Sequence, residues 1–221
     1  MKLHITEHDL RKYLQSKSLS ETIFDEIKAL HRDDGGKVRL DELNPGGRFR
    51  YGGVEWVKLD GMGDASLCLA TECVTKKAFD EANDNDWRTS SLREWLNNHN
   101  RAEYDGGFLG QLIESGGAKM EDFAFFRSDL TADDGMRDYG VADDIISLLS
   151  CDLYRKYRDA IPSVDDWCWT LTPWTCIAAY SYNVRGVNAS GTLAGTYAFN
   201  GSRGVRPLCN LKSDILVSCV E

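Results

Sequence analysis

The spacing of hydrophobic residues changes along the chain, and each change predicts a different element. Over residues 1–34, apolar side chains recur at helical intervals behind Thr6 and Ser20, which predicts two short capped helices. Helices this short are marginal alone, so we expect them to pack on the rest of the chain, on another copy or on an attachment partner. From Arg48 the spacing becomes an alternation interrupted by Gly52-Gly53, which predicts a hairpin, and a buried strand is expected over 66–71.

The middle of the chain contains both spacings. Ser90 caps a predicted amphipathic helix over 90–98, whose Leu92, Trp95 and Leu96 face the core. A second helix is predicted over 107–114. Residues 143–158 begin as a strand-like run and continue as a helix, with the break near Ser150. Beyond this point we expect short aromatic strands separated by Gly and Asn.

Residues 183–207 form the most informative segment. Small residues, Asn and Tyr stand between glycines there, and the segment closes on Gly204-Val205-Arg206-Pro207. Such a segment cannot build a packed helix, because glycine and asparagine tolerate the left-handed backbone angles of tight turns. Tyrosine adds a rigid amphipathic contact surface at low entropic cost. We therefore expect this segment to form a recognition surface.

Composition and charge narrow the class of protein. The 221 residues are 42% hydrophobic and 10% aromatic, which suits one folded domain with an appendage or two small domains. A formal net charge of −9 without a basic stripe argues against nucleic-acid binding. No apolar run approaches the roughly 20 residues that span a bilayer. The first residues carry charges throughout, so we expect synthesis in the cytoplasm without a signal peptide and no membrane insertion.

Cysteine and histidine offer little for a metal site. The seven cysteines stand at 68, 73, 151, 168, 176, 209 and 219 without a CxxC pair, and three of the four histidines precede residue 32. We therefore expect no zinc site, no other metal and no cofactor. Buried reduced thiols are the simplest expectation for the cysteines.

Other catalytic or binding chemistry has weak support. The histidines do not stand near a nucleophile-elbow pattern, so a Ser-His-Asp set is not indicated. Two glycine pairs, at 106–107 and 116–117, lack the spacing that cradles phosphates. Residues 80–86 form a carboxylate-rich loop. We expect a solvated surface loop there, with a calcium site as the alternative.

Six segments occur together in an order that resembles C-type-lectin-like domains of phage and gut-bacterial proteins. That family overlaps the variable proteins of diversity-generating retroelements. The resemblance covers about residues 46–219. The segments are 49–59 with its Gly-Gly and Trp, 87–97 (Trp-Arg-Thr-Ser-Ser-Leu-Arg-Glu-Trp-Leu-Asn), 144–150 (Asp-Ile-Ile-Ser-Leu-Leu-Ser), 169–173 (Trp-Thr-Leu-Thr-Pro), 187–191 (Val-Asn-Ala-Ser-Gly) and 204–207 (Gly-Val-Arg-Pro). At 169–173 the family commonly has Trp-Leu-Arg-Ser-Pro, so the contacts of that arginine must be made by other groups here.

The resemblance implies an α+β fold of the C-type-lectin-like kind. Small twisted antiparallel sheets and two main helices would hold a long, loop-rich C-terminal segment. It implies a helical N-terminal appendage over 1–35, a lectin-like domain over 46–221 and a variable, ligand-binding segment over 174–202. The candidate ligand-binding residues, expected on one face, are Trp174, Tyr180, Tyr182, Asn183, Asn188, Thr196, Tyr197, Phe199, Asn200 and Ser202.

A variable surface needs a fixed framework elsewhere. We expect Gly204 to supply a turn, Arg206 to tie loop carbonyls together through its five donors, and Pro207 to stiffen the exit. Large aromatic residues dominate core burial, so four tryptophans are expected in or near the core. These are Trp87, Trp95, Trp167 and Trp169.

The leading expectation is a non-enzymatic display protein that binds a protein or glycan through its C-terminal face. A retroelement would diversify that face, and the chain would belong to a phage particle or a cell-surface assembly, with residues 1–35 as an attachment or oligomer contact. Two alternatives stay open. One is a phage or bacterial structural or accessory domain with an invariant partner-binding face. The other is an oxidase similar to formylglycine-generating enzymes, which use cysteines and copper.

Overall fold

The computed structural model describes residues 37–99 and 106–220. The chain divides into two units, Met1–Val38 and Arg39–Glu221, and the short strand β1 (Lys37–Arg39) lies at their boundary. The two helices expected before residue 35, and the attachment role expected for them, lie outside the described residues. The following paragraphs concern the second unit.

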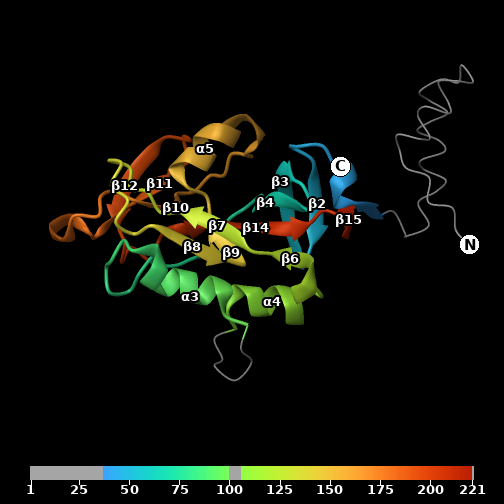
Figure 1. Cartoon of the computed structure of the whole chain (residues 1–221), viewed down its shortest axis with the longest axis horizontal. Coiled ribbons are helices and arrows are strands. Elements are labelled where there is room, and N and C mark those ends of the chain that lie inside the picture. The colour runs from blue at the N-terminus through green and yellow to red at the C-terminus, as the bar shows by residue number, and fades with distance from the viewer. Residues whose placement is uncertain (1–36, 100–105, 221) are drawn as a thin grey trace, which may run out of the picture. The chain divides into compact units, whose positions relative to one another are not determined.

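The larger sheet is antiparallel and follows the alternating pattern of the first strands. Its strands run in the order β15-β2-β3-β4-β14-β6, and β9 also pairs with β14 (Figure 1). The predicted hairpin and the predicted buried strand are its β2, β3 and β4, so both predictions are confirmed. The bounds are β2 (Arg48–Tyr51), β3 (Val54–Met62), β4 (Ala65–Ala70), β6 (Phe123–Ala124), β9 (Ile146–Leu148), β14 (Pro207–Lys212) and β15 (Leu216–Cys219).

The smaller sheet carries the glycine-rich segment. Its order is β12-β11-β10-β13-β5, and its pairs are antiparallel except for the parallel pair of β10 and β13. A separate ribbon pairs β7 with β8. The bounds are β5 (Thr75–Lys76), β7 (Phe126–Asp129), β8 (Val141–Asp144), β10 (Cys168–Pro173), β11 (Asn183–Val187), β12 (Leu193–Tyr197) and β13 (Gly204–Val205).

Three α-helices flank these strands in the described part of the second unit. Figure 1 shows α5 (Cys151–Tyr157) on one side and α3 (Ser91–Asn97) and α4 (Phe108–Glu114) on the other. The side chains of Ser90 and Ser150 accept the capping bonds of α3 and α5, which confirms both predicted starts. The α+β class is therefore confirmed. Short 3-10 turns complete the path: η1 (Leu40–Glu42), η2 (Trp87–Thr89), η3 (Met120–Asp122), η4 (Arg158–Ala160) and η5 (Ala178–Tyr180).

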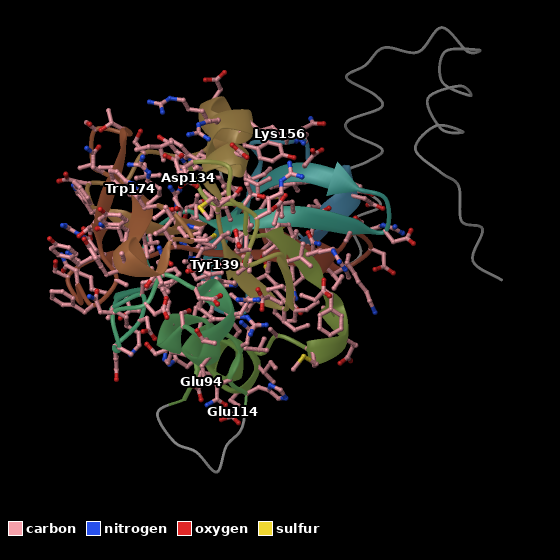
Figure 2. All side chains as sticks on the ribbon, turned by 60° about the vertical axis from the view of Figure 1, so that its left-hand side comes forward. Glu94, Glu114, Asp134, Tyr139, Lys156 and Trp174 are labelled. Carbon is pink, nitrogen blue, oxygen red and sulfur yellow. The ribbon has the colours of Figure 1, made fainter. Side chains whose placement is uncertain are left out.

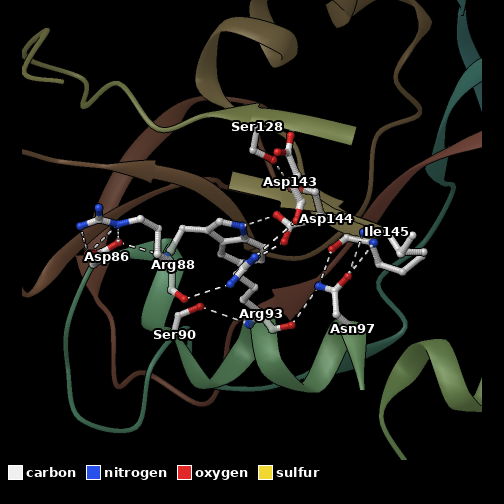
Figure 3. A network of polar contacts seen from close by, with 12 residues as sticks. Asp86, Arg88, Ser90, Arg93, Asn97, Ser128, Asp143, Asp144 and Ile145 are labelled. Atoms are coloured by element: carbon white, nitrogen blue, oxygen red, sulfur yellow. Dashed lines mark hydrogen bonds and ion pairs between the residues drawn. The ribbon is translucent and has the colours of Figure 1, made fainter. Parts of the chain in front are cut away.

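Asp144 joins α3 to β8. Trp87 Nε1 donates to its Oδ2 at 2.8 Å, and Arg93 Nε donates to its Oδ1 at 2.6 Å (Figure 3). The Asp144 side chain is 1% exposed, so its charge is offset by these two donors rather than by water. Asn97 adds two bonds to the main chain of Ile146, at 2.8 and 3.0 Å.

The Gly-Val-Arg-Pro motif carries the chain from one sheet to the other. Gly204 and Val205 form β13 of the smaller sheet, and Pro207 starts β14 of the larger one. Between them, buried Arg206 donates to the carbonyls of Ala70 at 2.7 Å and Thr71 at 2.9 Å. Its expected structural role is therefore confirmed, although the carbonyls belong to the end of β4 and not to the display loop. Gly204 lies in a strand, so the turn expected there is wrong.

The core lies between the sheets and the helices. Trp56, Trp87 and Phe79 are fully buried, and Trp169 is nearly so. The rings of Phe79 and Trp87 have centroids 5.6 Å apart, and those of Phe79 and Trp169 5.7 Å. Trp95 and Trp167 are half-buried at the edge of this core. Within the described ranges, no helix has both the length and the apolar character that crossing a bilayer requires.

Candidate ligand-binding face

Four aromatic side chains from two separate segments form one continuous group, here called the aromatic row: Tyr180, Tyr182, Tyr197 and Phe199. Successive ring centroids are 6.4, 5.5 and 5.7 Å apart. Tyr180, Tyr197 and Phe199 are 54%, 52% and 55% exposed, and Tyr182 is half-buried. Contiguous exposed rings are uncommon on the surface of a protein, so this row is the candidate site.

The hairpin of β11 and β12 brings the two segments of the row together. Asn183 pairs with Tyr197 at the open end of this hairpin. Ala198 then donates its amide to the carbonyl of Tyr182 at 2.9 Å. The residues just outside the paired positions therefore lie beside one another, which is why Tyr180 and Tyr182 meet Tyr197 and Phe199.

Trp174 extends the exposed face over the hairpin. Trp174, labelled in Figure 2, is 43% exposed. The Arg185 guanidinium lies 4.1 Å from the centroid of its ring. Gly195 stands opposite Arg185 in the hairpin register, and a Cβ there would lie 2.7 Å from the Trp174 ring. The ring therefore rests directly on the Gly195 backbone. Arg185 Nε also donates to Asp133 at 2.8 Å, which fixes the guanidinium under the ring.

Buried Asn85 holds the backbone beneath these rings. Its Nδ2 donates to the carbonyls of Thr175 at 3.0 Å and Asn183 at 2.9 Å, and its amide donates to the carbonyl of Ser181 at 2.6 Å. Its Oδ1 accepts from the Tyr139 hydroxyl at 2.8 Å. Burial raises the pKa of Tyr139 to about 12, so this hydroxyl stays a donor at neutral pH.

The carboxylate-rich loop 80–86, here called the bracket, is solvated only in part: Glu81, Ala82 and Asp84 are exposed, and the rest of the loop supports the face, which corrects the expectation of a solvated surface loop. Asp80, Asn85 and Asp86 are buried. Asp80 accepts from the Ser91 amide at 3.1 Å at the start of α3. Asn83, with a left-handed φ of 63°, accepts from the Phe199 amide at 3.2 Å. The carboxylates are engaged with protein donors, and no group of three metal-ligating side chains occurs in the described part of the chain.

Three predicted residues, Asn183, Asn200 and Ser202, lie near the row without belonging to it. Asn183 contributes its carbonyl to the Asn85 bracket. Asn200 forms a turn in which its Oδ1 accepts from the Ser202 amide at 3.1 Å and the Ser202 hydroxyl at 2.7 Å. Ser202 is exposed, so this turn supplies polar groups beside Phe199.

Asn188 and Thr196 lie apart from the row, in contrast to the expectation of one common face. Thr196 pairs with buried Val184, so strand alternation directs it to the side opposite Tyr197. Asn188 lies at the closed end of the hairpin, about 16 Å along β11 from Asn183. There its Oδ1 accepts from the amides of Ser190 and Thr192, both at 3.0 Å.

Sequence reasoning missed Arg185 and the bracket residues Asn83 and Asn85. Arg185 is the one cation inside a run of Gly, Asn and Tyr, from 174 to 202, and that contrast was an available signal. Asn85 had none, because its partners Thr175 and Asn183 lie 90 and 98 residues away in the chain.

Two cavities lie elsewhere on the second unit. One, of about 530 Å³, lies between α5 and the loop that follows β7 and is lined in part by Asp129, Asp133 and Arg155. A smaller one, of about 120 Å³, lies beside the closed end of the hairpin and reaches Tyr154, Cys168 and Arg206. Neither contains a residue of the aromatic row.

One family model matches part of the chain. It is described as a domain of unknown function (DUF6273), and it matches residues 152–213. The match runs from α5 into β14 and includes all ten candidate ligand-binding residues, although it covers well under half of the chain. The comparisons with curated proteins and with solved structures gave no match.

Proposed function

We propose that this chain is a non-enzymatic binding protein of the C-type-lectin-like kind that recognises a protein or a glycan through the aromatic row and Trp174. The observation that carries the proposal is the row itself: three rings are more than half exposed, Tyr182 joins Tyr180 to Tyr197, and Tyr197 stacks on Phe199. Isolated exposed aromatic residues are ordinary, whereas a contiguous set is not.

The chemistry of the face suits a recognition surface. Tyr and Phe supply contact area, and Asn200, Ser202 and Ser181 supply polar groups at the margin. Protein interfaces share this arrangement of an aromatic centre and a polar rim. Among the two ligand classes, a protein surface fits better. The Tyr197 and Phe199 rings stack on each other at an interplanar angle of 7°, so each covers one face of the other that a sugar ring would otherwise use.

The same face is suited to diversification by a retroelement. Adenine-directed mutation favours Asn codons, and its products include Tyr, Ser, Thr, Asp, Gly and Phe. All of these except Asp occur in 180–202. The bracket holds Phe199, Ser181 and Asn183 through main-chain atoms. A side chain at the surface can therefore change while its backbone keeps the same partners.

Deep sequencing of this gene in close relatives tests the diversification. We expect adenine-directed substitutions at the codons for Tyr180, Tyr197 and Phe199, with Asn85 and Arg206 unchanged, beside a template repeat and a reverse transcriptase gene. An invariant row among relatives would reject diversification and favour a structural or accessory domain with a fixed partner.

Ligand recognition is tested with panels of purified surface proteins and with a glycan array. The variant replaces Tyr180, Tyr197 and Phe199 by Ser, and the matched control is Phe125→Ser. Phe125 is 72% exposed and lies between β6 and β7, away from the row. Binding that the control keeps and the triple variant loses supports the proposal, and the panel that responds identifies the ligand class. Equal binding by both variants contradicts it.

A further inference from the structure

Two thiols distant in sequence meet at the boundary between the sheets. The sulfurs of Cys73 and Cys168 lie 2.8 Å apart, although 95 residues separate them. Cys73 belongs to the linker from β4 to β5, and Cys168 begins β10. The sequence offered no signal for this pair, because neither cysteine has a close neighbour of its own kind at CxxC spacing.

Strand β13 positions both cysteines. It pairs with β10 at Cys168 and Gly204, and on its other edge with β5. Val74, directly after Cys73, donates its amide to the Val205 carbonyl at 2.9 Å. A Cβ at Gly204 would lie 2.4 Å from the Cys73 sulfur, so only glycine leaves room for that sulfur. Backbone pairing on both sides of one strand therefore fixes the approach of the two thiols.

The two cysteines differ in access and acidity. Cys73 is half-buried, whereas Cys168 is buried and lines the smaller cavity. The hydrogen bond between the two sulfurs lowers the pKa of Cys73, while the same bond and burial raise the pKa of Cys168. The buried Arg206 guanidinium favours the thiolate of both, and Asp166 opposes it. Cys73 is thus the accessible nucleophile and Cys168 the second thiol.

We propose that Cys73 and Cys168 form a reversible disulfide by exchange with a low-molecular-weight disulfide. The Cys73 thiolate attacks one sulfur of the small disulfide, the S–S bond of that molecule breaks, and one small thiol leaves. Cys168 then loses its proton and attacks the Cys73 sulfur, which releases the second small thiol. The two protein thiols are oxidised, and one small disulfide is reduced to two thiols. The bond ties the exit of β4 to the first residue of β10 and thereby links the two sheets.

Cys68 and Cys209 provide the contrast inside the same molecule. They stand opposite each other in the register of β4 and β14. Both are fully buried, and burial raises the pKa of each thiol well above its usual range. A small disulfide reaches neither sulfur, so this pair stays reduced under conditions that oxidise Cys73 and Cys168.

The experiment treats the folded full chain with oxidised glutathione, blocks the remaining thiols, and maps tryptic peptides by mass spectrometry. Trypsin releases Cys73 together with Cys68 in peptide 59–76, and Cys168 together with Cys176 in peptide 159–185. We expect these two peptides to be joined in the wild-type chain and in the matched controls Cys68→Ser and Cys176→Ser. The joined pair is absent from Cys73→Ser and Cys168→Ser.

Thermal unfolding gives a second readout. The oxidised wild-type chain should have a higher Tm than the reduced chain, because the crosslink constrains a long loop in the unfolded state. That difference should disappear in Cys73→Ser. Near-ultraviolet circular dichroism confirms that each variant folds. A wild-type chain that stays reduced, or that stops at the mixed disulfide with glutathione, overturns the proposal, as does a peptide link that persists in Cys73→Ser.

Discussion

Single buried polar residues connect segments of this chain that are far apart in sequence. Asp144 receives donors from Trp87 and Arg93, which lie 57 and 51 residues before it. Asn85 donates to the carbonyls of Thr175 and Asn183, which lie 90 and 98 residues after it. Both side chains make hydrogen bonds in the folded state. Removing either one would leave buried partner groups without a hydrogen bond. Their contribution is therefore measured best by substitutions that keep the shape of the side chain.

Asp144→Asn should lower the free energy of unfolding by about 2 kcal/mol. The amide removes the charge that faces Arg93 and replaces one acceptor by a donor. The cost is smaller than for a fully buried ion pair, because the Arg93 side chain is 31% exposed. Asp143→Asn is the matched control. Its carboxylate is 55% exposed beside an exposed Arg127, so we expect a change below about 0.5 kcal/mol.

Urea unfolding of both variants, followed by tryptophan fluorescence, measures the two values. Equal free energies for the two variants would show that the network around Asp144 contributes no more than an exposed ion pair.

Arg206→Ala should cost about 3 kcal/mol, because it leaves the buried carbonyls of Ala70 and Thr71 without donors. Arg203→Ala provides the comparison from the same segment. The Arg203 guanidinium lies 4.1 Å from the Trp167 ring centroid, and its Nε has no partner in the described part of the chain. A cation–π contact of this kind contributes about 1 kcal/mol. Chemical denaturation should show a larger loss of stability for Arg206→Ala than for Arg203→Ala. The reverse order would argue that Arg206 does not anchor the connection from β13 to β14.

At the scale of elements, sequence patterns predicted the strands and helices that depend on interactions between residues close in sequence. The hairpin of β2 and β3, strand β4, helices α3 and α4, and the break at Ser150 all follow from periodicity and capping within a few residues. The structure of loop 80–86 could not be predicted in this way. Acidic residues are typical of solvent-exposed loops, and the partners that bury part of this one lie outside it in the sequence. Gly204 was misjudged for the same reason: its small size makes room for Cys73, which is remote in sequence.

The candidate face was predictable in composition but not in arrangement. Tyr180, Tyr182, Tyr197 and Phe199 stand out in the sequence, whereas their contact depends on the register of β11 and β12. A shift of one residue in that register would move Tyr197 to the other side of the sheet. Asn188 and Thr196 were included in the face because sequence alone does not reveal this register.

Gly195→Ala tests how Trp174 rests on the hairpin. The added methyl group would lie 2.7 Å from the Trp174 ring, so the ring must move off Arg185 and β12. We expect a loss of about 1–3 kcal/mol, as for other overpacked sites. Gly201→Ala is the control, since the nearest atom would lie 3.8 Å away. Unfolding in urea distinguishes the two variants. An unchanged free energy of unfolding for Gly195→Ala would mean that the Trp174 ring moves aside without loss of stability.

At the scale of the whole molecule, substitution of an exposed ring should affect the free energy of unfolding much less than substitution of a buried ring. Replacing Tyr180, Tyr197 or Phe199 singly by Ser should lower the free energy of unfolding by only about 1 kcal/mol, because each side chain is already half in water. Phe79→Ala, a single change at a fully buried ring, should cost about 3–5 kcal/mol.

Differential scanning calorimetry of these variants provides the comparison. If each single surface variant were destabilised as much as Phe79→Ala, the row would belong to the core and the proposed exchange of its side chains would fail.

The position of β14 has a consequence for biosynthesis. This strand, residues 207–212, lies between β4 and β6 and also pairs with β9, so three earlier strands depend on it for their hydrogen bonds. Those strands leave the ribosome long before their shared neighbour does. The nascent chain therefore carries unpaired strand edges until residue 212 has been made and released from the exit tunnel, and during that interval these edges are open to pairing with other chains.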